Sequence, residues 1–132
     1  MAIVADLQRR YPGIKVYVVG TSRSTEATMA LARLLDSRVA GFAHSSSMNA
    51  IASFDPRGLK SRNLIVLHKK DACQATEPSN GIASNRSYGT PLIEMDGGRS
   101  TGDECEAHAY HGYNGIERET VDKIKQWIAA GG

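Results

Sequence analysis

The apolar residues of the chain follow two patterns that alternate along its length. Continuous apolar runs suit strands that are buried on both faces of a parallel sheet. Four segments have such runs: residues 15–20, 39–43, 63–68 and 91–96. Apolar residues spaced three or four positions apart suit helices. Four segments show that spacing, the third of them weakly: residues 3–11, 23–36, 78–88 and 116–130.

This alternation predicts the fold class. Successive strand, helix and strand units form right-handed crossovers and build a parallel sheet that helices cover on both faces. We therefore expect an α/β fold, a three-layer sandwich with a mostly parallel sheet of about four strands. Residues 45–62 are polar and rich in turn formers, so we expect a loop there, with one helical turn near residues 48–53. The length fits a single domain, residues 1–132.

Composition narrows the classes of function. Hydrophobic residues make up 41% and charged residues 23% of the chain, which is typical of a folded domain and not of a disordered one. The 16 basic and 14 acidic residues give a net charge of +2 without long runs of one sign, which argues against a nucleic-acid partner. No window approaches the roughly 18 apolar residues that a membrane span needs. The first ten residues also lack the apolar stretch of a signal peptide.

Ser22 lies between the first predicted strand and the helix that follows, in Gly20-Thr21-Ser22-Arg23-Ser24. This is the setting of a nucleophile elbow, a sharp turn that raises a serine hydroxyl above the sheet and needs small residues two positions away on either side. The turn would also direct the backbone N–H of Arg23 toward an oxyanion. The alternative is that Ser22 is an ordinary serine cap at a helix N-terminus.

A serine nucleophile needs a base and an orienting carboxylate, and the later loops offer both. Asp71 follows the third predicted strand and His111 follows the fourth. Active groups gather at the carboxyl ends of parallel strands, so we expect Ser22, Asp71 and His111 to meet there. His108 is a rival base, but Gly112 gives the backbone beside His111 more freedom to turn the ring inward. The alternative for Asp71 is a turn aspartate without a catalytic role.

Four blocks of sequence, in this order, resemble a bacterial branch of the α/β-hydrolase superfamily. They are Gly20-Thr21-Ser22-Arg23-Ser24-Thr25, His68-Lys69-Lys70-Asp71-Ala72-Cys73, Cys105-Glu106-Ala107 and His111-Gly112-Tyr113-Asn114-Gly115-Ile116-Glu117. The resemblance implies hydrolysis of small acyl esters through an acyl-serine intermediate, with Ser22, His111 and Asp71 as catalytic triad. It implies no metal and no organic cofactor. It spans nearly the whole chain but corresponds only to the C-terminal half of that fold.

Within this resemblance, a bridge between Cys73 and Cys105 would tie together the loops that carry Asp71 and His111. By the chain-entropy model, such a bridge would stabilise the fold by roughly 3.7 kcal/mol. A bridge would indicate the periplasm or secretion, whereas two thiols would leave a cytoplasmic location open.

The missing half of the hydrolase fold leads to two further expectations. The strand from Lys15 to Gly20 should lie at a sheet edge, where it pairs with a second copy to form a homodimer or is covered by the first helix. The loop that gives the second oxyanion N–H in this superfamily should be absent, which would weaken activity. Two other functions stay open. One is a non-catalytic fragment or interaction module that needs a partner chain, and the other is a module that binds an anion at the Gly20–Thr25 turn.

Overall fold

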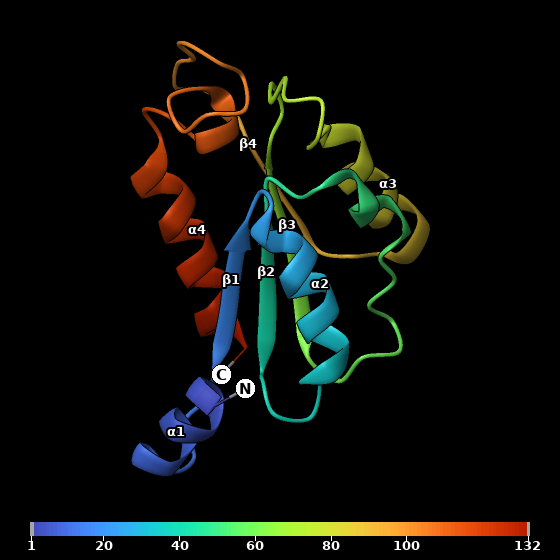
Figure 1. The fold of residues 1–132 in the computed structure, drawn as a ribbon, viewed down its shortest axis with the longest axis vertical. Helices are drawn as coiled ribbons and strands as arrows, with labels where there is room; N and C mark the ends of the chain where they lie inside the picture. Colours follow the sequence, from blue (N-terminus) through green and yellow to red (C-terminus); the bar gives the residue numbers. More distant parts are fainter. Residues whose placement is uncertain (1, 132) are drawn as a thin grey trace.

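The computed structural model describes residues 2–131 and contains four helices, four strands and two short 3₁₀ helices (Figure 1). In chain order these are α1 (Ala2–Arg10), β1 (Tyr17–Thr21), α2 (Ser24–Leu34), β2 (Gly41–Ser45), η1 (Asn49–Ser53), β3 (Arg62–His68), α3 (Pro78–Tyr88), β4 (Leu92–Met95), η2 (Tyr110–Gly112) and α4 (Glu117–Ala130). Each predicted strand and helix is present, with ends that differ by a few residues at most.

The four strands form one sheet in the order β1-β2-β3-β4, and every neighbouring pair is parallel. The register places Gly20 beside His44 and Ser45 beside Val66. All four strands therefore end at the same edge of the sheet, and the loops that follow them meet there. The prediction of a parallel sheet of four strands is confirmed.

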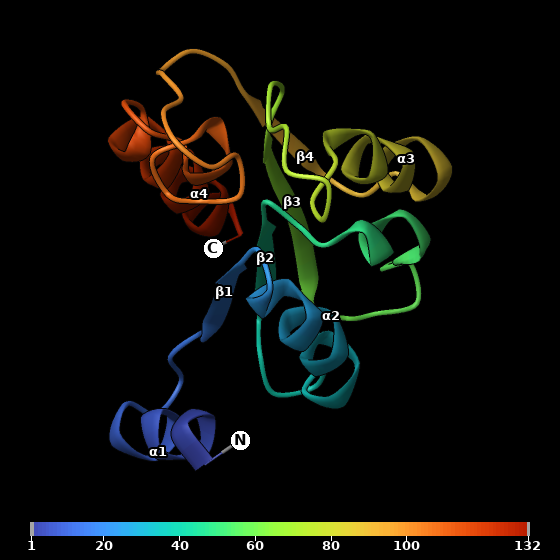
Figure 2. The same cartoon turned by 45° about the horizontal axis from the view of Figure 1, so that its top comes forward.

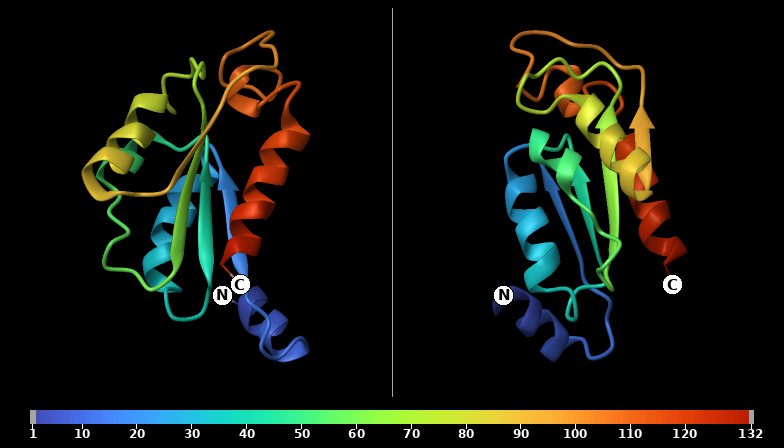
Figure 3. Two further views of the ribbon diagram at one scale, coloured as in Figure 1. Left: turned by 180° about the vertical axis from the view of Figure 1, so that it is seen from behind. Right: turned by 90° about the vertical axis from the view of Figure 1, so that its right-hand side faces the viewer.

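The helices cover the two faces of the sheet unequally. Each strand is added on the same side of the one before it, so right-handed crossovers bring every connection to the same face. Helices α2, η1 and α3 accordingly lie on one face, and α4 covers the other after the chain leaves β4 (Figures 1 and 3). This arrangement confirms the predicted three-layer α/β sandwich.

Each face of the sheet has its own hydrophobic core. The core beneath α2, η1 and α3 contains Val4, Ala32, Leu35, Val39, Phe42, Ile51, Phe54, Ile65 and Leu67. The core beneath α4 contains Ala43, Leu64, Val66, Met95, Tyr113 and Ile124. Because β2 and β3 contribute to both cores, their residues are buried almost without interruption, as their apolar runs indicate.

Helix α2 turns its threonines and one alanine toward the sheet, with Leu31 and Leu35 beside them at its C-terminal end. Its buried residues are Thr25, Thr28 and Ala32, whereas Leu34 is 71% exposed. The helix approaches β1 so closely that a Cβ on Gly20 would lie 2.5 Å from the Thr28 methyl group. Small side chains at this contact allow the helix to begin directly after the strand.

The edge strand β1 is not covered by the first helix, so that alternative was wrong. Helix α1 lies past the N-terminal end of the sheet, away from the length of β1 (Figure 2). Its Val4 packs into the core beneath α2, and its Gln8 side chain donates a hydrogen bond to the Arg38 carbonyl. Val19, in the middle of β1, is 52% exposed.

Candidate active site

Ser22 forms a sharp turn between β1 and α2. Its backbone φ of 56° lies in the left-handed region, which residues other than glycine rarely adopt. The Ser22 N–H donates to the Ser45 carbonyl of β2 at 2.9 Å, so the sheet hydrogen bonding continues up to the turn. The serine is therefore held just beyond the last residue of the strand, as a nucleophile elbow requires.

The hydroxyl of Ser22 does not cap α2. The N-cap position is occupied by Arg23, and it makes no side-chain cap hydrogen bond. The turn is instead fixed by Thr25, whose buried hydroxyl donates to the Ser22 carbonyl and accepts from the Met48 N–H at 2.9 Å. The helix cap proposed as the alternative role for Ser22 is thus not found, and its hydroxyl is available for another partner.

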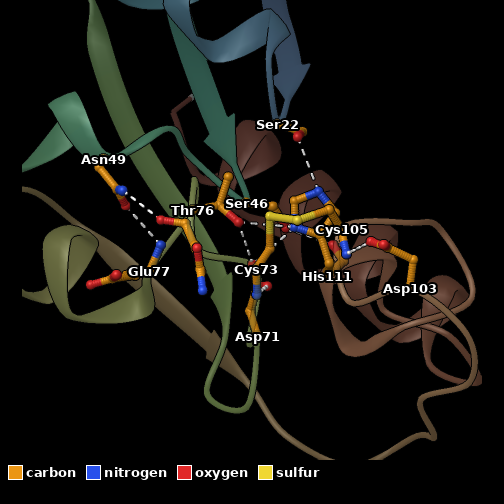
Figure 4. Close-up of a disulfide and its surroundings, with 11 residues drawn as sticks. Ser22, Ser46, Asn49, Asp71, Cys73, Thr76, Glu77, Asp103, Cys105 and His111 are labelled. Carbon is orange, nitrogen blue, oxygen red and sulfur yellow. Dashed lines mark hydrogen bonds and ion pairs between the residues drawn. A yellow bond between two sulfur atoms is a disulfide. The ribbon is translucent and has the colours of Figure 1, made fainter.

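That partner is His111, and the chain of contacts continues to Asp71 (Figure 4). The Ser22 Oγ lies 3.0 Å from His111 Nε2, and His111 Nδ1 lies 3.0 Å from Asp71 Oδ2. Because a carboxylate only accepts hydrogen bonds, it selects the tautomer with the proton on Nδ1. In that tautomer Nε2 accepts the proton of the Ser22 hydroxyl. The structure thus brings together the three side chains that the sequence indicates, one from each of three loops at the same sheet edge.

Asp71 is buried and held from two further sides. Its Oδ1 accepts a hydrogen bond from the Cys73 N–H at 3.0 Å, and its Oδ2 accepts one from the Thr76 hydroxyl at 3.0 Å. The Thr76 oxygen also lies 3.0 Å from His111 Nδ1. Sequence reasoning did not single out Thr76, because a threonine five residues after an aspartate has no distinctive pattern.

The disulfide between Cys73 and Cys105 is present, which confirms that prediction (Figure 4). It joins the Asp71 loop to the long loop that ends at His111. Every residue from 96 to 108 of that loop is exposed. The bond is therefore a covalent anchor for a segment that has little packing of its own.

The rival base His108 lies in this exposed loop. Its backbone carbonyl accepts hydrogen bonds from the Thr101 N–H and the Asn114 side chain, which shape the loop. His111, by contrast, is 6% exposed and makes the contact with Ser22. The preference for His111 over His108 agrees with this geometry.

The backbone N–H of Arg23 follows the Ser22 turn. Among residues 2–131, no acceptor for this N–H is found. It is therefore free to donate to a negatively charged oxygen bound beside Ser22.

Tyr113 anchors the loop of His111 to the sheet, and sequence reasoning did not single it out. Its hydroxyl donates to the Val66 carbonyl at 3.0 Å and lies 2.8 Å from Ser45 Oγ and 3.1 Å from Ser46 Oγ. Burial raises the pKa of Tyr113, with a smaller contribution in the same direction from the charge of Asp71. Both effects keep the hydroxyl protonated and able to donate.

The remaining two histidines are buried in the sheet. His44 lies between the Thr28 hydroxyl, 2.7 Å from Nδ1, and the Asn63 side-chain oxygen, 2.9 Å from Nε2. Its burial lowers its pKa, because the charged imidazolium would lose its hydration. His68 lies with Nε2 2.8 Å from the Gly97 carbonyl, and its Nδ1 accepts from the Lys70 N–H.

Residues 2–131 show neither a metal-binding cluster nor a membrane-spanning helix. No group of three or more His, Cys, Asp and Glu side chains is arranged to bind a metal ion. No helix in the same part of the chain has both the length and the apolar character that a bilayer span requires.

Comparisons with known proteins do not assign the chain to a family. No family model, no curated protein and no solved structure matches it. The chain is an α/β protein with a candidate serine-dependent site at the edge of its sheet.

Proposed function

We propose that the chain is a serine hydrolase that cleaves small carboxyl esters through an acyl-serine intermediate. The observation that carries this proposal is the continuous hydrogen-bonded series Ser22–His111–Asp71, with 3.0 Å at both contacts. A serine hydroxyl is a weak nucleophile until a base removes its proton. An imidazole with Nδ1–H directed at a carboxylate and Nε2 directed at the hydroxyl is arranged for that task.

The proposed reaction has two stages. Ser22 Oγ attacks the ester carbonyl while its proton moves to His111 Nε2, and Asp71 stabilises the resulting imidazolium. His111 then returns the proton to the leaving alcohol, and the acyl group remains on Ser22. A water molecule, deprotonated by the same imidazole, releases the acid and restores Ser22.

Charge that develops on the ester oxygen needs hydrogen-bond donors, and the Arg23 N–H is the proposed first donor. An oxyanion hole of this type has two donors in the resembled superfamily. Loss of one donor lowers the rate by a factor of about 10² to 10³. With the Arg23 N–H as its one assigned donor, we propose that hydrolysis at this site is weak.

Hydrolysis of p-nitrophenyl acetate tests the proposal. The purified chain should release p-nitrophenol faster than buffer, and Ser22→Ala should reduce the rate to that of buffer. Ser79→Ala, which changes an exposed serine of α3, is the matched control and should keep the wild-type rate. Equal rates for wild type and Ser22→Ala would contradict the proposal.

We also propose that the chain forms a homodimer through the free edge of β1. The Val16 carbonyl and the Ser22 N–H bond toward β2, so the alternate residues Tyr17, Val19 and Thr21 direct their backbone groups away from the sheet. Exposed strand edges of this kind pair with other strands. The half-exposed Val19 adds apolar surface at the centre of the edge.

Sedimentation analysis distinguishes this dimer from a monomer. The wild-type chain should sediment as a dimer and exchange its amides slowly along β1, whereas Val19→Lys should sediment as a monomer. Leu34→Lys places the same charge on an exposed leucine of α2 and should leave the dimer intact. A wild-type monomer with rapid exchange of the outward-directed Tyr17 and Val19 amides would refute the pairing.

The disulfide supports a proposal about the compartment. Structural disulfides persist in oxidising environments, whereas cytosolic reductants keep most thiols reduced. We propose that the chain works in the periplasm or after secretion. Alkylation of extracts without prior reduction should leave Cys73 and Cys105 unlabelled, and labelling of both in the native host would contradict this location.

A further inference from the structure

Left-handed backbone conformations are concentrated around the candidate site. Among residues 2–131, the non-glycine residues with positive φ are Ser22, Ser46 and Tyr113, at 56°, 43° and 57°. Such conformations are unfavourable for residues with a side chain and persist where surrounding contacts impose them. Ser22 carries the proposed nucleophile. The strained backbones of Ser46 and Tyr113 indicate that these two residues also have a role at the site.

Ser46 contacts the proposed base directly. It follows the last residue of β2 and is 1% exposed. Its hydroxyl donates to the backbone carbonyl of His111 at 2.7 Å (Figure 4). The bond therefore fixes the main chain of the residue whose imidazole meets Ser22.

The Tyr113 hydroxyl completes this attachment, and its hydrogen bonds can be assigned consistently. It has one proton, which it donates to the Val66 carbonyl. The Ser46 N–H donates to the same carbonyl at 2.9 Å and also reaches the Tyr113 oxygen at 3.2 Å. The Tyr113 oxygen can also accept from the Ser45 hydroxyl at 2.8 Å. Ser45 in turn accepts from the Thr21 hydroxyl at 3.3 Å.

This series of hydroxyl groups connects the tip of β1 to the loop of His111. Thr21 immediately precedes Ser22, and the series runs through Ser45 to Tyr113, two residues after His111. The two reacting side chains thus have a common attachment to the sheet. We propose that Ser46 and Tyr113 are positioning residues that hold the His111 imidazole at hydrogen-bond distance from Ser22, an inference that rests on the proposed function.

The long part of the loop before the buried Ala109 cannot supply this positioning by packing. Residues 96–108 are all exposed, and the disulfide joins the loop to the Asp71 side of the site. The contacts of Ser46 and Tyr113 hold the loop on the side of Ser22. A displacement of about 1 Å between reacting groups can lower a rate by a factor of 10².

Three single substitutions test the role of the pair. Ser46→Ala removes the hydroxyl that reaches His111, and Tyr113→Phe removes the phenolic oxygen that ties the loop to β2 and β3. Both should lower kcat for p-nitrophenyl acetate by about 10- to 100-fold with KM nearly unchanged. Ser46→Gly also lacks the hydroxyl but adopts φ of 43° without strain, so it should lose as much activity as Ser46→Ala.

A buried serine away from the site provides the control for general destabilisation. Ser84 of α3 is fully buried, and its hydroxyl donates to the Phe54 carbonyl at 2.9 Å. Ser84→Ala loses a hydrogen bond of the same kind and should keep kcat within about twofold. Equal kcat losses in Ser46→Ala and Ser84→Ala, or full activity in Ser46→Gly, would overturn the proposal.

A second readout does not depend on hydrolysis. The proton between His111 Nδ1 and Asp71 should give a downfield proton NMR signal that is protected from exchange with water in the wild type and in Ser84→Ala. Ser46→Ala and Tyr113→Phe should broaden or remove it. If the wild-type chain hydrolyses no ester but the signal still responds in this way, the positioning role holds and the proposed function fails. An unchanged signal in both variants overturns the positioning role.

Discussion

His44 and His111 are both buried, and both ring nitrogens of each histidine are within hydrogen-bond distance of a partner. Their partners differ. His44, in the middle of the sheet, lies between a threonine hydroxyl and an amide oxygen. His111, at the edge where the strands end, lies between a serine hydroxyl and a carboxylate. The two regions use the same residue in similar geometry, but only one of them combines a negative charge with a hydroxyl near the surface.

The difference indicates what converts a structural histidine into a candidate base. The carboxylate of Asp71 would stabilise the imidazolium that forms when His111 accepts a proton, and the amide of Asn63 offers His44 no such charge. The hydroxyls also differ in access, because Thr28 is 3% exposed whereas Ser22 is partly exposed on a strained turn. Burial and hydrogen bonding alone do not identify a catalytic histidine.

The largest expected effect comes from making the partner of His111 resemble that of His44. Asp71→Asn replaces the carboxylate by an amide, which removes the charge and favours the wrong imidazole tautomer. We expect kcat for p-nitrophenyl acetate to fall by about 10³ to 10⁴. The reciprocal change, Asn63→Asp, places a carboxylate beside His44 and is the control. It should neither abolish nor enhance hydrolysis, because Thr28 is inaccessible to an ester.

The second effect concerns the loop that carries His111. The Cys73–Cys105 bond closes a separation of 32 residues, for which the chain-entropy model gives about 3.7 kcal/mol of stabilisation. Replacing both cysteines by serine should lower the free energy of unfolding in urea by up to that amount. The rate of hydrolysis should fall by more than the loss of folded protein accounts for, because the bond joins the loop of Asp71 to the loop of His111. A double variant with wild-type stability and activity would show that the bond is dispensable.

The smallest effect is a dependence of stability on pH that His44 should cause. Burial lowers the pKa of His44 below its ordinary value of 6.5, so the unfolded chain takes up a proton there that the folded chain does not. The free energy of unfolding should therefore fall as the pH drops below 6.5, by at most about 1.4 kcal/mol per unit. In urea titrations at several pH values, the free energy of unfolding should depend less steeply on pH in His44→Gln than in the wild type.

A matched histidine variant makes that measurement specific. His108→Gln changes an exposed histidine and should leave the slope at its wild-type value. A slope that is the same in wild type and His44→Gln would show that His44 is not the group responsible.

Much of the fold was predictable from sequence because the strands are apolar on both faces. The runs that became β2 and β3 are interrupted by few polar residues, and the loops after β1, β3 and β4 carried a serine, an aspartate and histidines in an interpretable order. Several apolar residues of the predicted helices are nevertheless exposed, among them Ile3 of α1, Leu34 of α2 and Val121 of α4.

The supporting hydroxyl groups were not predictable in the same way. Tyr113 and Ser46 are separated by 67 residues along the chain, so their contact follows from the register of three strands and not from a local motif. The residue type of Ser46 gives no indication of its left-handed backbone, because serine does not favour positive φ. The contacts of Thr76 and the burial of the α2 threonines could not be predicted either, because both depend on close packing in the folded chain.

Mass spectrometry after treatment with a fluorophosphonate tests the central claim most directly. The reagent transfers its phosphonyl group to a serine that a neighbouring base has activated, so wild type should carry one adduct on the peptide that contains Ser22. That adduct should be absent in His111→Gln and present in His108→Gln. Failure of Ser22 to react in the folded wild-type chain, or equal reaction in His111→Gln, would contradict the account.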